Sequence, residues 1–340
     1  MGDRFHKVCV LDAEGEVVER VRLVNTRDGV EAFFSERPPL AVAIEAGTHS
    51  GWVARLLEGL GHRVLVAQPR AVRAIWDRDR KNDDGDAELL ARLLRADPKL
   101  LHPVKLRSEE AQIDQLAIKA RDGLVQVRTK LINQARGLAK SLGHRLPSSD
   151  ARSLVPKARC GLPAQFEEAF GPLWTVLEAV EEQIRVFDHA IRDLAKNRYP
   201  QTERLTQVTG VGALTALAFM LSIDDPQRFK RSRDVGPFFG LIPKQDQSGD
   251  TDKQLRITKA GDGYVRRLLV GSAQYILGHF GPPCTLRTFG LHLAERGGRN
   301  AKRRAVVAVA RKLAVLLHAL WVSGDPYDPN RGLPQADEAA

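Results

Sequence analysis

The stretch Leu40-Ala41-Val42-Ala43-Ile44-Glu45 decides how the first part of this chain folds. It follows two prolines and is apolar except for its last residue, which is typical of a strand buried on both faces. A second short run of this type, Val64–Ala67, comes after an amphipathic helix that we predict from Ser50 to Leu60. Because a strand, a helix and a strand follow one another, the sequence predicts a mixed α/β domain.

The chain continues the same kind of fold on both sides of this stretch. Toward the N-terminus, Lys7–Leu11 and Glu16–Val24 are predicted strands around a turn, which makes them a hairpin, and Asp28–Phe34 is a predicted short helix. Toward the C-terminus, Asp83–Leu94 is predicted to be a helix with one leucine-rich face. These segments predict a first domain of residues 1–105.

Residues 106–200 are predicted to form a helical segment. Apolar residues at spacings of three and four indicate one long helix over Ser108–Leu142, and a second over about Leu173–Lys196. Two long helices with a link that contains proline and glycine favour a helical hairpin or a coiled coil. The first helix is basic in its second half, which either a solvated surface or contact with phosphates explains. Its candidate phosphate contacts are Arg128, Lys130 and Arg136.

Residues 201–323 are predicted to form a mostly helical third domain. Helices are expected at Asp262–Leu277 and Ala301–Val322, and a loop region rich in glycine and proline at Asp234–Asp252. The tail 324–340 is rich in proline and aspartate, which predicts disorder.

Composition and charge restrict the kind of partner. Lys and Arg number 52 against 42 acidic residues, so the net charge is +10. This balance favours a polyanion such as nucleic acid, although a surplus that only keeps the protein soluble gives the same numbers. Three scattered cysteines argue against a disulfide framework and a cysteine-ligated zinc site. The first residues show no positive segment followed by an apolar run, so we expect no signal peptide. The longest apolar stretch, Ala213–Leu221, is too short to cross a bilayer, and we expect a soluble cytoplasmic protein.

Three carboxylates form the first candidate site. Glu45 closes the buried strand, and Asp83 and Asp86 lie three residues apart at a helix start, so both point to one face. Such carboxylates can converge on hard cations such as Mg²⁺, and two such ions stabilise the attacking and leaving oxygens of phosphoryl transfer. The helix dipole also favours acidic residues in any first turn. Glu45 lacks an easy packing explanation and favours the metal interpretation.

A turn that contains two glycines forms the second candidate site. The segment Thr209-Gly210-Val211-Gly212, followed by an apolar helix, has the form of a helix-hairpin-helix turn. Gly210 and Gly212 would let the backbone approach a phosphate, and the following helix would offer free N–H groups. A tight turn between two packed helices has the same sequence, so both interpretations stay open.

A serine in a polar loop forms the third candidate site. Ser248 precedes Gly249, and such a serine is usually a turn residue rather than a nucleophile. No GxSxG elbow or nearby His–Asp pairing indicates acyl transfer. Basic residues that could hold phosphates lie nearby in the sequence: Lys244, Arg256, Lys259, Arg266 and Arg267.

Taken in order, these motifs resemble one family. The chain carries Glu45-Ala46-Gly47-Thr48, then Lys81-Asn82-Asp83-Asp84-Gly85-Asp86-Ala87, a basic helix, Thr209–Gly212, Gly240-Leu241-Ile242-Pro243 with Gln247-Ser248-Gly249, and Ile257–Asp262. This order resembles the DEDD transposases of the insertion sequence one-ten family. The resemblance runs from residue 1 to about residue 322, and it rests on the order and spacing of motifs that are each modest.

The resemblance implies a fold and a mechanism. It implies a RuvC-like, ribonuclease-H-type first domain, a coiled-coil segment and a C-terminal transposase domain. It implies that Glu45, Asp83 and Asp86 are three of four acidic Mg²⁺ ligands, and that Ser248 is the nucleophile and forms a phosphoserine link to DNA. It further implies a homo-dimer or tetramer, a guide RNA encoded by the mobile element, and a place near the bacterial nucleoid.

The N-terminus departs from the family pattern. In the family, a first strand with an Asp precedes a strand like Lys7–Leu11, whereas this sequence starts inside the turn between them. Because that strand is central in the sheet, its loss is expected to expose backbone groups and apolar faces of its neighbours. Two alternatives to a transposase stay open, and the missing strand supports the second of them. One is a junction-cleaving nuclease that uses only the carboxylates, and the other is a non-catalytic nucleic-acid-binding protein.

Overall fold

The computed structural model describes residues 1–70, 72, 83–248 and 251–331, and its contacts divide the chain into two compact units, Met1–Glu109 and Glu110–Ala340. We describe each unit by itself. Lys81 and Asn82, which belong to the acidic motif, and the tail residues 332–340 lie outside the described residues.

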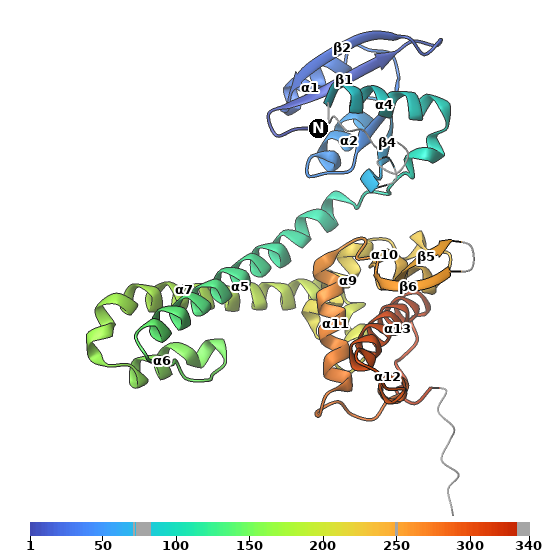
Figure 1. Ribbon diagram of the computed structural model, residues 1–340. Helices are drawn as coiled ribbons and strands as arrows, with labels where there is room; N and C mark the ends of the chain where they lie inside the picture. Colours follow the sequence, from blue (N-terminus) through green and yellow to red (C-terminus); the bar gives the residue numbers. More distant parts are fainter. Residues whose placement is uncertain (71, 73–82, 249–250, 332–340) are drawn as a thin grey trace, which may run out of the picture. The chain divides into compact units, whose positions relative to one another are not determined.

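The first unit is an α/β fold with small sheets (Figure 1). Strands β1 (Phe5–Leu11) and β2 (Val17–Val24) form the expected antiparallel hairpin, with Val8 paired to Val21. Strands β3 (Ala41–Glu45) and β4 (Arg63–Ala67) form a parallel pair, with Ile44 opposite Val66. The helices are α1 (Arg27–Phe34), α2 (Ser50–Gly59), α4 (Asp83–Ala96) and the short 3₁₀ turn η1 (Pro98–Leu101).

The core of the first unit lies between these strands and helices. Val30 and Phe34 of α1 and Val53 and Leu57 of α2 pack with Ile44 and with the other buried strand residues. Thr26 caps α1 by accepting a hydrogen bond from the backbone N–H of Gly29. The strand–helix–strand order expected from Leu40–Ala67 is therefore present, and it leaves Glu45 at the carboxyl end of β3.

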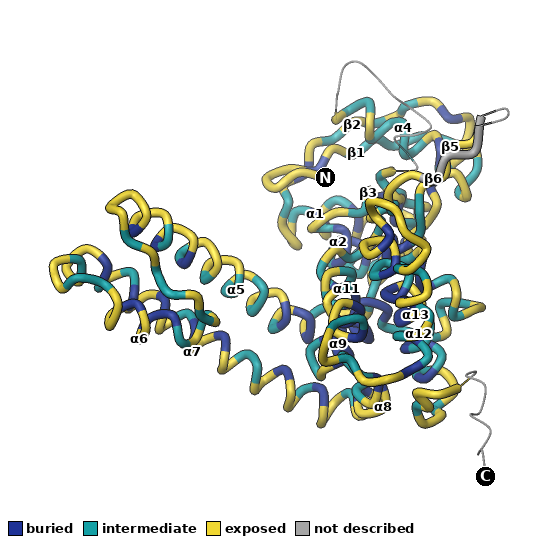
Figure 2. Tube along the Cα trace, turned by 60° about the horizontal axis from the view of Figure 1, so that its bottom comes forward, coloured by how far each residue is buried: buried dark blue, intermediate teal, exposed yellow. Residues whose placement is uncertain are grey.

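The second unit begins with two long helices that run antiparallel. Helix α5 spans Glu109–Ser141, and α7 spans Glu167–Asn197, with α6 (Ala151–Gly161) and the short turn η2 (Ala164–Phe166) between them. At their far end, Ile132 and Ala135 of α5 pack with Phe170 and Trp174 of α7 and with α6. Figure 2 shows long exposed and half-buried stretches on α5 and α7. A helical hairpin is therefore present, while supercoiling of the pair stays a prediction.

The remainder of the second unit is a helical core. Its helices are α8 (Thr202–Thr206), α9 (Ala213–Ile223), α10 (Val235–Phe238), α11 (Gly263–Leu277), α12 (Thr285–Glu295) and α13 (Ala301–Ser323). Two short 3₁₀ turns, η3 (Pro226–Arg228) and η4 (Ser232–Asp234), follow α9. Helix α9 is buried from Thr215 onward and packs with α7, α8 and α11, and Ile118 of α5 and Ile191 of α7 join the same core.

A β-hairpin lies where the sequence predicted a loop. Strand β5 (Pro243–Ser248) pairs antiparallel with β6 (Thr251–Ile257), within and beyond the segment Asp234–Asp252. The prediction of a loop there was wrong. The strand was not predicted because β5 is polar at almost every position, so the alternation of apolar and polar residues that indicates a half-buried strand is missing.

Two further features concern the C-terminal part. Residues 324–331, in the segment predicted to be disordered, make hydrogen bonds, because the backbone N–H of Thr285 donates to the carbonyl of Pro329 and that of Tyr327 donates to Gln207. Helix α13 is long and apolar enough to cross a membrane by length and composition. However, Val309, Ala310 and Leu313 of α13 are fully buried in the core, as in the central helix of a folded domain.

Candidate active site and nucleic-acid interface

The three carboxylates expected to bind metal line one cavity of the first unit. Glu45 ends β3, and Asp83 and Asp86 lie in the first turn of α4. All three border a cavity of about 500 Å³ whose walls are β1, β3 and α4. Glu45, Asp83 and Asp86 are all exposed.

The neighbouring acids of α4 have a different role. Asp84 forms an ion pair of 2.9 Å with Lys7 of β1, and Glu88 accepts hydrogen bonds from Arg20 of β2 and from Arg92. The hydrogen bonds from Arg20 and Arg92 lower the pKa of Glu88. Asp84 and Glu88 therefore fasten the helix to the hairpin, whereas Asp83 and Asp86 make no ion pair with any described residue.

The donor chemistry of the cavity suits a divalent cation, but the ligand set is not assembled. Carboxylate oxygens are the ligands that Mg²⁺ prefers, and the three carboxylates share one cavity. Among the residues that the structure describes, however, no three side chains of His, Cys, Asp or Glu lie close enough together to hold one ion. The three carboxylates are suitable metal ligands and share one cavity, but their side chains do not form a complete coordination site.

The same cavity separates two strands that each pair on one side only. Strands β1 and β3 both line it along their length, and in the described part of the chain β1 pairs with β2 and β3 with β4. The apolar side chains of Val8, Val42 and Ile44 belong to the lining or the adjacent core. One wall residue, His6, is buried although neither ring nitrogen has a hydrogen-bond partner among the residues that the structure describes. Nothing in the sequence indicated a role for His6.

The glycine turn lies between α8 and α9. Gly210 has φ +82°, and a Cβ atom there would lie 3.1 Å from the carbonyl oxygen of Ser272 on α11. Close packing against α11 therefore accounts for Gly210. Gly212 is the N-cap of α9, where a Cβ would meet no atom within 4 Å and no side chain caps the helix. Only Gly212 is placed as a phosphate-contacting glycine would be.

Ser248 is the last residue of β5. Its backbone pairs with Thr251 at the start of β6, next to residues 249 and 250, which lie outside the described residues. Lys244 is exposed on the same strand. The serine therefore stands near the end of a hairpin rather than in an irregular loop.

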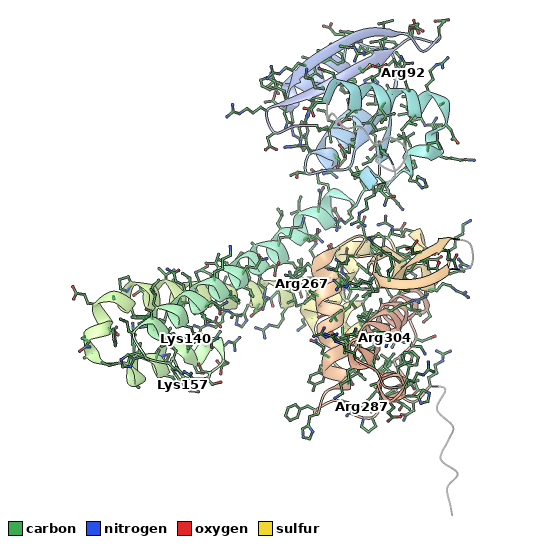
Figure 3. All side chains as sticks on the ribbon, in the orientation of Figure 1. Arg92, Lys140, Lys157, Arg267, Arg287 and Arg304 are labelled. Atoms are coloured by element: carbon green, nitrogen blue, oxygen red, sulfur yellow. The ribbon has the colours of Figure 1, made fainter. Side chains whose placement is uncertain are left out.

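Three basic residues expected to contact nucleic acid have partners in the protein. Arg128 forms an ion pair of 2.7 Å with Glu181 of α7, and Arg267 one of 2.8 Å with Asp122 of α5. Arg266 donates to the carbonyl oxygens of Phe239 and Ala260. Figure 3 shows Arg267 on α11, where it faces the hairpin helices. These side chains hold elements of the second unit together.

Four other basic residues that were expected to contact nucleic acid lie on α5 or at a cavity along α13. Lys130 is exposed and Arg136 half-buried on α5, and neither makes an ion pair with a described residue. Arg256 and Lys259 line a large cavity along α13 with Arg303, Arg304, Arg311 and Lys312. Sequence reasoning missed these last four, although Lys302-Arg303-Arg304 is a visible basic run at a helix start.

The chain matches known transposases in two family models and in several relatives. Residues 1–143 match the model for DEDD transposases of the IS110 type, and residues 202–287 match one described as "Transposase IS116/IS110/IS902 family". The transposase for insertion sequence element IS1111A of Coxiella burnetii is 30% identical over 328 residues, 94% of this chain and 88% of the relative. A probable family 20 transposase of Pseudomonas aeruginosa is 30% identical over 337 residues, 97% of each. The pilin gene-inverting protein of Moraxella bovis is 26% identical over 152 residues, 43% of this chain and 46% of the relative.

Proposed function

Because this chain belongs to the IS110 family of transposases, we propose that it cuts and rejoins DNA strands with Ser248 as nucleophile and with Glu45, Asp83 and Asp86 as metal ligands. The observation that supports this proposal best is the cavity of the first unit, which the three carboxylates share. Asp83 and Asp86 make no ion pair with described residues, while Asp84 of the same turn is held by Lys7.

The chemistry is a phosphoryl transfer to serine and back. The Ser248 Oγ attacks the phosphorus of one strand, a P–O bond to the leaving nucleotide breaks, and the serine proton ends on the released hydroxyl. Attack by a hydroxyl of another strand reverses these steps, so the strands are exchanged without an external energy source. A bound Mg²⁺ would supply charge stabilisation at the phosphate oxygens. Lys244, on the strand that carries Ser248, would contribute positive charge for the phosphate.

Partners beyond DNA belong to the proposal as well. We propose that the protein works as a homo-dimer or tetramer with a guide RNA encoded by the mobile element. Purification of the full chain from cells that carry the gene with its flanking DNA tests both. Light scattering measures the mass of the assembly. RNA that copurifies with the protein and is degraded by ribonuclease is the expected sign of a bound guide RNA.

The decisive experiment uses a plasmid that carries this gene with its flanking DNA, and it detects rejoined DNA ends by PCR and protein-linked DNA on denaturing gels. Ser248→Ala is expected to abolish both signals, whereas Thr251→Ala, a hydroxyl on the paired strand, keeps them. Asp83→Asn and Asp86→Asn are expected to abolish them, whereas Asp84→Asn keeps them. Cleavage that survives Ser248→Ala would replace the proposal by the junction-type nuclease.

A second candidate function is nucleic-acid binding without cleavage. It is favoured by one observation, namely that no three metal-binding side chains converge within the described residues. DNA affinity in the absence of any rejoined or protein-linked DNA, with Mg²⁺ or Mn²⁺ present, would establish this candidate.

A further inference from the structure

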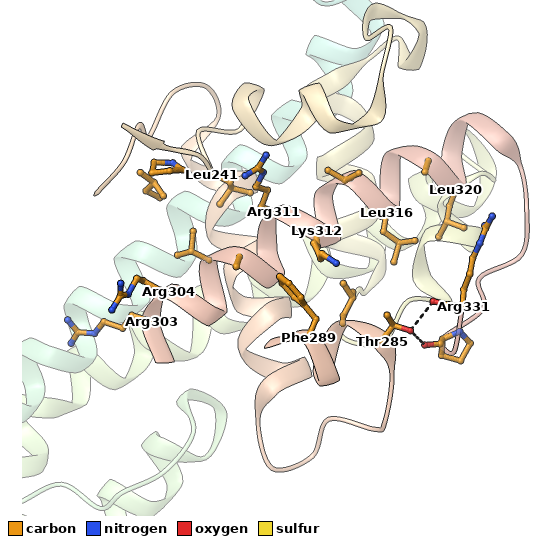
Figure 4. A pocket seen from close by; sticks show the side chains of 18 of the residues that line it. Leu241, Thr285, Phe289, Arg303, Arg304, Arg311, Lys312, Leu316, Leu320 and Arg331 are labelled. Carbon is orange, nitrogen blue, oxygen red and sulfur yellow. Dashed lines mark hydrogen bonds between the residues drawn. The ribbon is translucent and has the colours of Figure 1, made fainter. Parts of the chain in front are cut away.

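The second unit contains a long groove that follows helix α13. Its volume is about 1560 Å³, and its walls are the β5–β6 hairpin, α12, α13 and the segment 326–331. We call it the α13 groove. It runs from Arg303 and Arg304 near the start of α13 to Leu320 and Arg331 at the other end (Figure 4). At 1.5 Å per residue, this length of helix is about 25 Å.

The α13 groove is strongly positive. Its lining contains seven exposed basic side chains that we call the groove cations: Arg256, Lys259, Arg303, Arg304, Arg311, Lys312 and Arg331. Among the residues that the structure describes, Asp328 is the only acidic one in the lining, and none of them forms an ion pair with a groove cation. Like charges held together in one concave surface repel each other and attract a polyanion.

Helix α13 adds an independent reason for an anion. Lys302, Arg303 and Arg304 occupy its first turn, which contains no acidic residue, and its N-cap residue Asn300 makes no capping hydrogen bond. The helix dipole disfavours cations at this end, and the first backbone N–H groups are donors for an anion. Asn300, Arg303 and Arg304 line the groove, so an anion bound there would compensate both.

The floor of the groove is apolar. Leu255, Ile257, Phe289, Val307 and Leu316 line it between the basic side chains. Leu255 is 49% exposed, and the Nζ of Lys312 lies 4.0 Å from the centre of the Phe289 ring. A nucleic-acid duplex hides its base faces in the stack and offers mainly phosphates to a surface, whereas a single strand offers both phosphates and bases.

We propose that the α13 groove binds a single strand of nucleic acid, with phosphates on the groove cations and bases over Leu255 and Phe289. The proposal rests on the proposed function for the source of this strand, because strand exchange on DNA exposes unpaired nucleotides. The groove would then hold a strand that is separated from its partner. An acidic peptide is the other ligand that charge alone would allow.

The test measures binding of the full-length protein to fluorescein-labelled 12-nucleotide oligo(dT) and to a 12-base-pair duplex by fluorescence anisotropy, over a range of salt concentrations. The double variant Arg303→Gln/Arg304→Gln is expected to weaken oligo(dT) binding roughly tenfold. It is also expected to make the negative slope of log K against log salt less steep by about 1.4, since each phosphate contact of a single strand contributes about 0.7. The matched control is Arg296→Gln/Arg299→Gln, which removes two exposed arginines just before α13 that do not line the groove.

A third variant tests the apolar floor. Leu255→Ser is expected to weaken oligo(dT) binding severalfold with an unchanged salt slope, and to leave duplex binding unaltered. Equal losses in the two double variants would overturn the proposal, because they would show a response to net charge only. Polyglutamate that competes as well as oligo(dT) would overturn it in favour of an acidic peptide. Because binding is read without catalysis, loss of strand exchange with intact groove binding would contradict only the proposed function.

Discussion

Arg128 of α5 donates a hydrogen bond of 2.7 Å to the Glu181 carboxylate of α7, and this ion pair joins the two long helices of the hairpin. The Glu181 side chain is only 9% exposed, and its second oxygen accepts a hydrogen bond of 3.2 Å from Arg152. Arg128, which the sequence analysis gave as a candidate phosphate contact, thus binds a nearly buried carboxylate.

This relationship predicts unequal effects of substitution. Glu181→Gln removes the charge that faces two arginines and is expected to lower the free energy of unfolding by about 3 kcal/mol, as when one partner of a buried ion pair is removed. Arg152→Gln changes a side chain that is 68% exposed and is expected to cost less than about 1 kcal/mol. Urea unfolding followed by circular dichroism compares them, and equal losses would contradict the prediction.

Tyr199 and Asp114 form a second polar contact at the base of the helical hairpin. The Tyr199 hydroxyl donates a hydrogen bond of 2.6 Å to Asp114, which is 7% exposed and also accepts from Arg198. We expect Tyr199→Phe to lower the free energy of unfolding by about 1.5 kcal/mol, the usual contribution of a hydrogen bond to a charged group. The measurement is again urea unfolding. Tyr275→Phe, on an exposed tyrosine, should leave stability unchanged, and a similar loss there would argue against the assignment.

Burial of Tyr199 and its bond to Asp114 raise the pKa of the phenol above its ordinary value of 10. A raised pKa contributes stability that is complete below the ordinary value and is lost as pH rises through the folded value. Above pH 10, the free energy of unfolding should therefore fall more steeply with rising pH for the wild type than for Tyr199→Phe.

Gly240 is predicted to be irreplaceable by alanine. It has φ +64°, and a Cβ there would lie 2.2 Å from the backbone nitrogen of Ala260. Gly240→Ala is therefore expected to cost about 2 kcal/mol or more, since neither the conformation nor the space allows a side chain. Gly271→Ala, in helix α11 with open space around it, should be neutral or stabilising. Thermal unfolding decides, and a stable Gly240→Ala protein would show that the neighbouring backbone can move.

His6 predicts a pH dependence of the first unit. Burial, the largest cause, and the positive charge nearby lower the pKa of its imidazole below 6.5. A lowered folded pKa contributes stability that is present above the unfolded value and is lost as pH falls, because the unfolded state binds the proton more tightly. Melting curves should therefore lose stability on acidification from pH 6.5 downward in the wild type and less so in His6→Phe. The exposed His189→Gln serves as control, and parallel curves for wild type and His6→Phe would refute the prediction.

Local sequence patterns placed most of the secondary structure. The apolar runs at Leu40–Glu45 and Val64–Ala67 became β3 and β4, and the spacing of apolar residues after Ser108 gave one long helix, α5. The β5–β6 hairpin was not predicted because the sequence of β5 is polar at almost every position and shows no alternation. Its register comes from pairing across the turn, which single-residue patterns do not encode.

The candidate sites, too, depend partly on local sequence and partly on tertiary packing. By itself the sequence determined that Glu45 would close a strand and that Asp83 and Asp86 would share one turn of a helix, because these are local patterns. Only the tertiary structure decided that the three border one cavity, that Arg128 and Arg267 are held by Glu181 and Asp122, and that Arg256 and Arg303 line one groove. The reason is physical: the partner of a charged side chain depends on how helices pack, and packing joins residues that are far apart in the chain.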